Sequence, residues 1–201
     1  MYRFFIKPLS DFVLAFIALV LFSPVFFVLA VFIKLDSSGP VFFRQDRLGK
    51  NGKVFVIFKF RSMVDCAIEK GTGLSTFEGD PRITRMGAFL RKTSLDEIPQ
   101  LINILLGDMS FIGPRPPVTY FPHKIEDYND FELRRFQVKP GISGLAAIRC
   151  REIHDWNINI PIDVEYVENI SLSLDFKLFM HSLLVFFKTD NIYSNNKIKN
   201  K

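Results

Sequence analysis

An uncharged apolar run, residues 12–33, is the strongest pattern along the chain. A helix needs about 20 apolar residues to cross a membrane, and the run supplies them. Ser23 and Pro24 lie at its centre. Proline removes a backbone donor and clashes with the carbonyl one turn earlier, so the helix is predicted to kink there, and the serine hydroxyl can satisfy the freed carbonyl. The run can form a kinked span or a re-entrant hairpin of two halves, each about 16 Å long.

Basic residues flank the run on both sides, namely Arg3, Lys7, Lys34, Arg44, Arg47, Lys50 and Lys53. Lysine and arginine prefer the cytoplasmic side of a membrane, so charge on both flanks favours the re-entrant hairpin. The run is too long for a signal peptide and has no small-residue cleavage site. We therefore expect residues 1–36 to form a membrane helix–break–helix, residues 37–188 a domain at the cytoplasmic face, and residues 189–201 a polar disordered tail.

The rest of the chain predicts an α+β, mainly helical fold. Residues 41–45 and 53–60 are rich in Val, Ile and Phe and flank Gly49-Lys50-Asn51-Gly52, which predicts a β-hairpin. Apolar spacing predicts a helix over residues 82–92 and another that ends at Gly107. Leu172–Phe187 is either an interfacial amphipathic helix in the headgroup plane or an ordinary core helix.

The composition narrows the range of possible binding partners. The formal net charge is +5, which suits anionic headgroups, phosphates or nucleic acid. The chain has 23 Phe, which favours contact with membrane lipid. A nucleic-acid binder leaves the apolar run without a role, so no nucleic acid is expected. Cys66 and Cys150 lie far apart with no CxxC, as is typical of a reducing compartment.

Asp96 and Glu97 are the first candidates for chemistry. Either Ser94 and Glu97 form a capping box, or Asp96 is the N-cap of a helix whose first turn contains Pro99. Both interpretations place the two carboxylates at the positive end of a helix, where they stay ionised. Ionised carboxylates can bind a divalent metal, act as a base or act as a nucleophile, although acidic residues are also common helix caps.

Three cations are further candidates. Prolines on either side of Arg115 hold the backbone of that residue, and a rigidly presented guanidinium suits phosphate or pairs with a carboxylate in a stiff loop. Lys59 and Arg61 share one face of the second predicted strand, where they can bind a ligand or protect a sheet edge.

Residues 139–144 form a glycine-bearing turn that allows a ligand to approach, although a plain turn explains it equally well.

Taken in order, these motifs resemble the bacterial sugar transferase family in its small form, the monotopic phosphoglycosyl transferases. The matching stretches are Ser23-Pro24 and residues 58–63, 91–101, 107–116, 139–144 and 163–175. Each motif is weak alone, but the ordered set covers nearly the whole chain. Residues 145–151 depart from the tryptophan and amide pattern that often follows in the family, so the resemblance names no sugar.

The resemblance implies a phosphosugar transferase at the cytoplasmic face of the bacterial inner membrane. Such an enzyme moves a phosphosugar from a UDP-sugar donor to an undecaprenyl phosphate acceptor and releases UMP, in the first membrane step of glycan assembly. Its apolar segment is a re-entrant helix bent at Ser-Pro, and its small members are compatible with a homo-oligomer. The alternative is a non-catalytic, membrane-anchored adaptor of a glycan-assembly pathway, which has no need of Asp96, Glu97 and Arg115 in one pattern.

Residue roles follow from the same motifs. The resemblance implies that Asp96 is the nucleophile of a covalent phosphosugar intermediate and that Glu97 completes the dyad. Both carboxylates are also expected to hold Mg²⁺. Arg91 and Arg115 are expected to bind the substrate phosphates, with Lys59 and Arg61 as weaker candidates.

Overall fold

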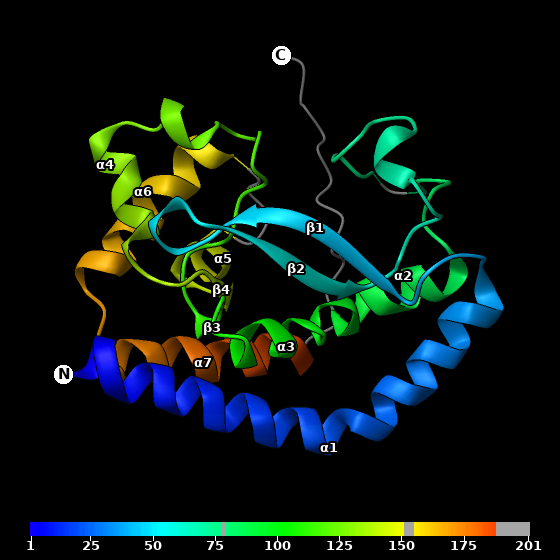
Figure 1. Cartoon of the computed structure of the whole chain (residues 1–201), viewed down its shortest axis with the longest axis horizontal. Helices are drawn as coiled ribbons and strands as arrows, with labels where there is room; N and C mark the ends of the chain where they lie inside the picture. Colours follow the sequence, from blue (N-terminus) through cyan, green and yellow to red (C-terminus); the bar gives the residue numbers. More distant parts are fainter. Residues whose placement is uncertain (78, 151–154, 188–201) are drawn as a thin grey trace, which may run out of the picture.

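The computed structural model of the chain describes residues 1–77, 79–150 and 155–187. The described part is mainly helical and contains two small sheets of two strands each, which confirms the coarse fold class. Helix α1 lies along one side of the molecule, and the hairpin β1–β2 lies above it (Figure 1). Helices α4, α5 and α6 gather towards one end of the hairpin. The polar tail expected over residues 189–201 lies outside the described residues.

The α-helices are α1 (Lys7–Asp36), α2 (Arg85–Lys92), α3 (Gln100–Leu105), α4 (Asp130–Leu133), α5 (Leu145–Arg149), α6 (Trp156–Glu168) and α7 (Leu172–Phe187). The strands are β1 (Phe42–Leu48), β2 (Val54–Phe60), β3 (Ser110–Ile112) and β4 (Gly141–Ser143). A π-helical turn, Tyr2–Ile6, leads into α1. A 3₁₀ turn, Leu95–Glu97, precedes α3.

Helix α1 bends in its middle without breaking (Figure 1). Pro24 lies inside the helix and leaves the carbonyl of Val20 without its usual amide donor. The Ser23 hydroxyl donates to that carbonyl oxygen at 2.8 Å, so the bend leaves no orphaned acceptor there. The predicted kink is confirmed, but the expected helix–break–helix is one continuous bent helix. Within the described residues, only Tyr2–Asp36 is long and apolar enough to cross a membrane.

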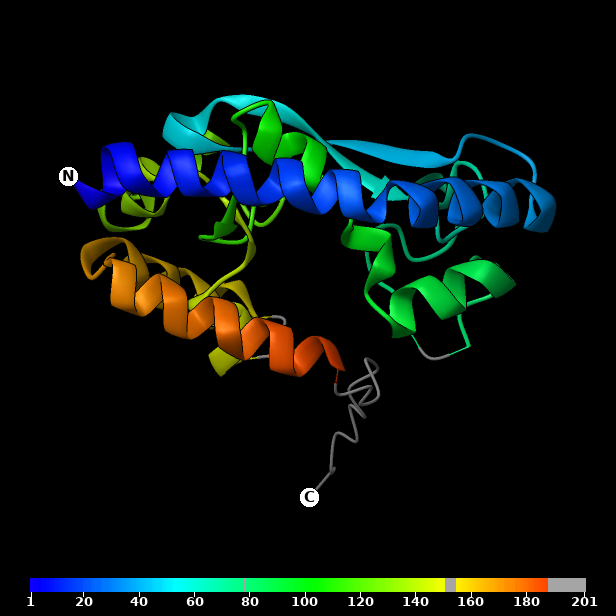
Figure 2. The ribbon, with the colours of Figure 1, turned by 90° about the horizontal axis from the view of Figure 1, so that it is seen from below.

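One side of α1 packs on the domain and the other side is exposed. Ala15 packs with residues of β2 and α3, and Leu29 and Ile33 pack around Phe60 and Leu90. Large apolar side chains of α1 and α7 are exposed, and they include Phe12, Phe16, Leu21, Phe27, Leu172, Phe176 and Leu184. Figure 2 shows α1 and α7 on the same side of the molecule. Soluble monomers rarely expose so much apolar surface in one region.

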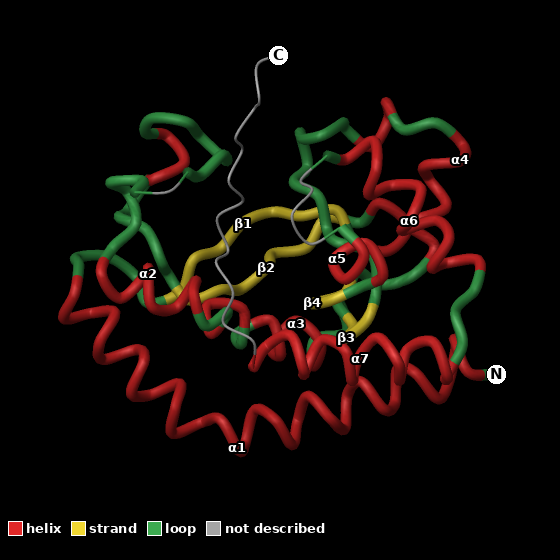
Figure 3. The backbone as a smooth tube through the Cα atoms, turned by 180° about the vertical axis from the view of Figure 1, so that it is seen from behind, coloured by secondary structure: helices red, strands yellow, loops and turns green. Residues whose placement is uncertain are grey.

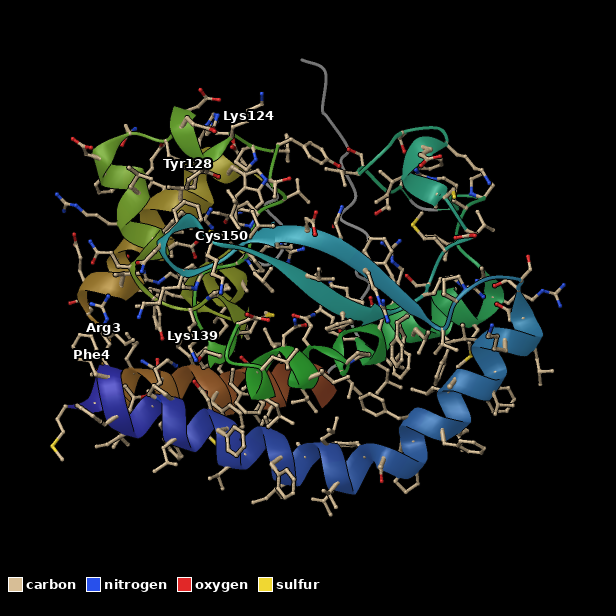
Figure 4. All side chains as sticks on the ribbon, viewed as in Figure 1. Arg3, Phe4, Lys124, Tyr128, Lys139 and Cys150 are labelled. Carbon is tan, nitrogen blue, oxygen red and sulfur yellow. The ribbon has the colours of Figure 1, made fainter. Side chains whose placement is uncertain are left out.

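The N-terminal end of α1 is fastened to the domain by polar contacts. The Lys7 ammonium lies 2.7 Å from the Asp175 carboxylate of α7, and both side chains are buried. The Tyr2 hydroxyl donates to the same carboxylate at 2.5 Å. Arg3, at the N-terminal end of the chain (Figure 4), donates to the Gln137 carbonyl at 2.8 Å. Breaking these contacts would leave buried charges unpaired, so this end of α1 is held firmly.

The C-terminal end of α1 is fastened by Arg61, which follows β2. Arg61 is 5% exposed, and its guanidinium donates to the carbonyl oxygens of Ile33, Ser37 and Ser38. These oxygens are at or just beyond the last helical turn, where a cation is favourable. Both ends of α1 are therefore attached to the same domain.

The predicted hairpin is confirmed. Strands β1 and β2 pair antiparallel from Phe42–Phe60 to Leu48–Val54. Asn51 adopts a left-handed conformation with φ of 57°, as the Asn-Gly signal indicates. The first strand runs to Leu48 rather than to residue 45, because its pairing with β2 continues to the turn.

Helix α2 begins at Arg85, three residues later than the predicted start at residue 82. Thr84 is the N-cap and accepts from the Gly87 amide at 2.9 Å. Arg82 is buried outside the helix, with Asp80 at 2.7 Å. The cap and the ion pair decide the boundary, and apolar spacing alone does not report either of them.

The parallel pair β3–β4 was not predicted (Figure 3). Residues 139–144 were expected as a turn, but Gly141 pairs with Ser110. A Cβ at Gly141 would lie 2.1 Å from the Gly113 nitrogen, so glycine is required where the two backbones meet. The close approach is therefore between backbones, and it fixes the start of the loop that carries Arg115.

Candidate active site

Asp96 and Glu97 lie in the 3₁₀ turn between α2 and α3. Ser94 has φ of 55° and makes no side-chain cap bond, and α3 starts only at Gln100. Neither expected cap is therefore present. Glu97 is turned to a different partner: its carboxylate lies 2.5 Å from the Lys59 ammonium of β2. A long-range ion pair takes the place of the local capping box.

Positive charge keeps Glu97 ionised. Burial raises the pKa of this carboxyl, but the charges of Lys59, Arg115 and Arg47 together outweigh burial and hold the pKa below its ordinary value. Glu97 is therefore a permanent anion near neutral pH.

The pKa of Asp96 is shifted in the opposite direction. Burial raises its pKa to about 6, and repulsion from Glu97 adds to the effect, while Lys59 and Arg91 oppose it. The environments of two adjacent carboxyls thus push their pKa values apart, which is a recurrent property of catalytic pairs. Asp96 is mostly ionised at neutral pH and is more basic than an ordinary aspartate. That combination suits a nucleophile.

Arg91 and Arg115 approach the dyad from different elements. Arg91 is in the last turn of α2, and its buried Nη1 has no hydrogen-bond partner among the described residues. Arg115 is exposed, but its backbone is held: Arg135 donates to its carbonyl at 2.8 Å. Arg135 is itself buried against Asp163 at 2.5 Å. The backbone of the loop is thus held at Arg115, and this arginine is exposed to solvent near Glu97.

The structure brings Asp96, Glu97, Lys59, Arg91 and Arg115 together, because each of these cations acts electrostatically on at least one of the two carboxyls. It does not place Arg61 with them. Arg61 has its hydrogen bonds at the C-terminal end of α1 instead, for the reason given above. These contacts support a structural role rather than the phosphate-binding role we expected.

Arg47 of β1 is the cation that sequence reasoning missed as a site residue. Its charge acts on Glu97, and its Nη1 donates to the Pro116 carbonyl in the Arg115 loop at 2.8 Å. The sequence contains a usable signal. The Asn-Gly turn implies a hairpin register, and that register places Arg47 on the same face as Lys59.

The divergent run after Gly144 begins in the core and continues at the surface. Leu145 and Ala146 of α5 are buried, and Leu145 packs with Ile112 and Tyr166. Arg149 pairs at the surface with Glu165 at 2.5 Å. Residue 151 lies outside the described residues. The described part of the run therefore contributes packing rather than groups that act on the dyad.

An ionised carboxylate pair among four cations is suited to chemistry on an anionic substrate. The family model described as "Bacterial sugar transferase" matches residues 2–189, and the chain belongs to this family. A UDP-N-acetylgalactosamine-undecaprenyl-phosphate N-acetylgalactosaminephosphotransferase of Aeromonas hydrophila is 43% identical over 92% of the chain and 43% of its own length. A UDP-glucose:undecaprenyl-phosphate glucose-1-phosphate transferase of Caulobacter vibrioides is 37% identical over 93% of the chain and 72% of its own length.

A third relative, an uncharacterised sugar transferase of Bacillus subtilis, is 39% identical over 87% of the chain and 83% of its own length. The chain spans less than half of the Aeromonas hydrophila relative. The likeness to that longer protein concerns the part of it that the chain matches.

Proposed function

We propose that this protein transfers a phosphosugar from a UDP-sugar to undecaprenyl phosphate, with UMP as the other product. The observation that carries the proposal is the dyad, in which the pKa of Asp96 is raised and the pKa of Glu97 is lowered. Cations from β1, β2, α2 and the Arg115 loop act on the two carboxyls. The names of the Aeromonas hydrophila and Caulobacter vibrioides relatives, which specify UDP-sugars and undecaprenyl phosphate, support this substrate pair.

The proposed reaction has two displacement steps. In the first, a carboxylate oxygen of Asp96 attacks the sugar-side phosphorus of the donor, and UMP departs with the electron pair of the bridging oxygen. In the second, a phosphate oxygen of undecaprenyl phosphate attacks the same phosphorus, and the bond to Asp96 breaks. Both steps bring anions together, so Lys59, Arg91 and Arg115 lower the barrier by reducing charge repulsion.

We also propose that Mg²⁺ assists at the dyad. Asp96 and Glu97 supply carboxylate oxygens, which magnesium prefers, and their mutual repulsion favours a cation between them. The described residues contain no cluster of three or more His, Cys, Asp or Glu side chains that could hold a metal. Magnesium commonly binds through one or two carboxylates together with substrate phosphates, so this donor set fits the ion. Bound Mg²⁺ would supply positive charge to the diphosphate oxygens.

A re-entrant position in the bacterial inner membrane, with the domain on the cytoplasmic face, completes the proposal. Both ends of α1 are attached to one domain, through Lys7 and Arg61, while its bend and outer side are apolar and exposed. A domain cannot lie on both sides of a membrane, so a helix attached to it at both ends enters and returns. Single cysteines at Tyr2 and Ser37 should both react with a reagent added on the cytoplasmic side, and reaction from opposite sides would establish a span.

The decisive experiment uses the full chain in lipid nanodiscs with a UDP-sugar labelled at the β-phosphate and no acceptor. Quenched protein should retain the label, and added undecaprenyl phosphate should remove it. UDP-glucose and UDP-N-acetylgalactosamine are the first donors to test. Asp96→Asn should retain no label, whereas Asp46→Asn, which changes an exposed carboxylate on β1, should label normally. Wild-type protein that never retains label with any donor would refute the covalent route.

A further inference from the structure

Arg47 is held in an unusual way for a half-buried cation. The register of the hairpin pairs Arg47 with Phe55 and Phe43 with Lys59, so both cations project from one face. They lie four residues apart along the strands, or about 13 Å. Arg47 donates to two neutral oxygens, the Pro116 carbonyl at 2.8 Å and the Gln45 side chain at 2.6 Å. Among the described residues, no carboxylate forms an ion pair with it.

The positive charge at this position is only partly compensated. Burial lowers the pKa of Arg47 to about 10 and repulsion from Arg115 adds to the effect, while Glu97 opposes it. The Arg47 Nε is buried and has no hydrogen-bond partner among the described residues. Two arginines are thus brought together through one loop, because Arg47 binds the Pro116 carbonyl next to Arg115. Such an arrangement gains stability when an anion enters.

The four cations differ in which carboxyl of the dyad they act on. Arg91 acts on Asp96, Arg47 and Arg115 act on Glu97, and Lys59 acts on both. A diphosphate has two phosphorus atoms, and in-line attack places the leaving oxygen on the far side of the attacked phosphorus. If Asp96 attacks beside Arg91, the departing phosphate lies on the side of Glu97. This step rests on the proposed function.

We propose that Arg47 and Arg115 form the subsite for the nucleotide-side phosphate of the donor, which becomes the phosphate of the released nucleoside monophosphate. The fork of donors on each guanidinium can bind phosphate oxygens in pairs. Arg47 is pre-organised by Gln45 and Pro116, so little side-chain freedom is lost on binding. The subsite holds the donor before attack and stabilises the negative charge that develops on the leaving group.

The test is calorimetric titration of the full chain in nanodiscs with UMP and MgCl₂. Arg47→Gln should weaken UMP binding about tenfold or more, since hydrogen bonds to charged groups contribute strongly. Arg47→Lys, which keeps the charge and loses the fork, should bind with intermediate affinity. The matched control is Arg44→Gln: it removes the same charge from an exposed residue of β1, whose guanidinium lies over the Phe58 ring. It should leave UMP affinity within about twofold of wild type.

Kinetics separate this role from a purely structural one. The KM for the UDP-sugar in the labelling reaction should rise in Arg47→Gln, and the KM for undecaprenyl phosphate should change less. If Arg47 only braces the Arg115 loop, its variants lower the unfolding temperature without weakening UMP more than Arg44→Gln does, and the proposal is overturned. Should Arg47→Gln fail to fold, wild-type affinity in Arg47→Lys would also overturn it. The UMP titration does not require the covalent reaction, so failure of the proposed function remains distinguishable.

Discussion

Asp96→Asn should produce a protein that is inactive and yet more stable than wild type. The substitution keeps the size of the side chain and removes its charge. In the folded chain that charge is unfavourable, because burial and the neighbouring Glu97 raise the pKa of Asp96. The unfolded chain has no such penalty. Removing the charge should therefore stabilise the fold while it abolishes the proposed nucleophile.

The size of the effect follows from the pKa. A rise from 3.8 to about 6 corresponds to about 3 kcal/mol at high pH. Asp96 is only partly removed from solvent, so we expect a gain between about 1 and 3 kcal/mol at pH 8. For a chain of this size each kcal/mol raises the unfolding temperature by about 2–4 °C.

The stability difference between Asp96→Asn and wild type should depend on pH. At pH 8 Asp96 is ionised in both states, and the folded state bears the full penalty. As the pH falls through about 6, folded Asp96 takes up a proton first, so the advantage of Asn shrinks to about half by pH 5 and disappears below the ordinary pKa of 3.8. Covalent labelling of wild type should fall over the same range, because a protonated carboxyl is a poor nucleophile.

Glu97→Gln is the matched comparison. The pKa of Glu97 is lowered by Lys59 and its neighbours, so its charge stabilises the fold above its ordinary pKa and that contribution is lost as the pH falls. Glu97→Gln should therefore unfold at a lower temperature than wild type at pH 8. The assay is thermal unfolding in nanodiscs at fixed scan rate, from pH 5 to pH 8. An Asp96→Asn variant no more stable than wild type at pH 8 would contradict the reasoning, as would an advantage that does not shrink on acidification.

Three further predictions concern the bend of α1 and the contacts that hold its two ends. Pro24→Ala restores a backbone donor and should straighten the helix, which strains its attachments at Lys7 and Arg61. In the fraction of molecules in which one attachment is lost, cysteines at the two ends of the helix should become accessible from opposite sides. Lys7→Met leaves Asp175 buried without its ammonium partner and should destabilise the protein by about 3 kcal/mol or more, measured by chemical unfolding. Arg61→Met should lower the unfolding temperature while leaving UMP affinity unchanged; a loss of affinity would return Arg61 to the phosphate site.

Local signals in the sequence were sufficient for much of the architecture. Pro24 acts on the carbonyl four residues earlier and Asn51 on its own turn, so the bend and the hairpin could be predicted without knowing any distant contact. The acidic pair and the proline-flanked Arg115 were also evident from neighbouring residues. The order of the motifs indicated the family, which the match over residues 2–189 confirms.

The sequence by itself thus determined the apolar run, its bend, the hairpin and the chemical identity of the dyad, because each depends on residues within one or two turns. Only the tertiary structure decided that Glu97 pairs with Lys59, that Arg61 holds the end of α1, and that Arg47 joins the site. It also decided that the two carboxyls titrate apart. These properties depend on burial and on charges contributed by separate elements, and neither is visible in a local pattern.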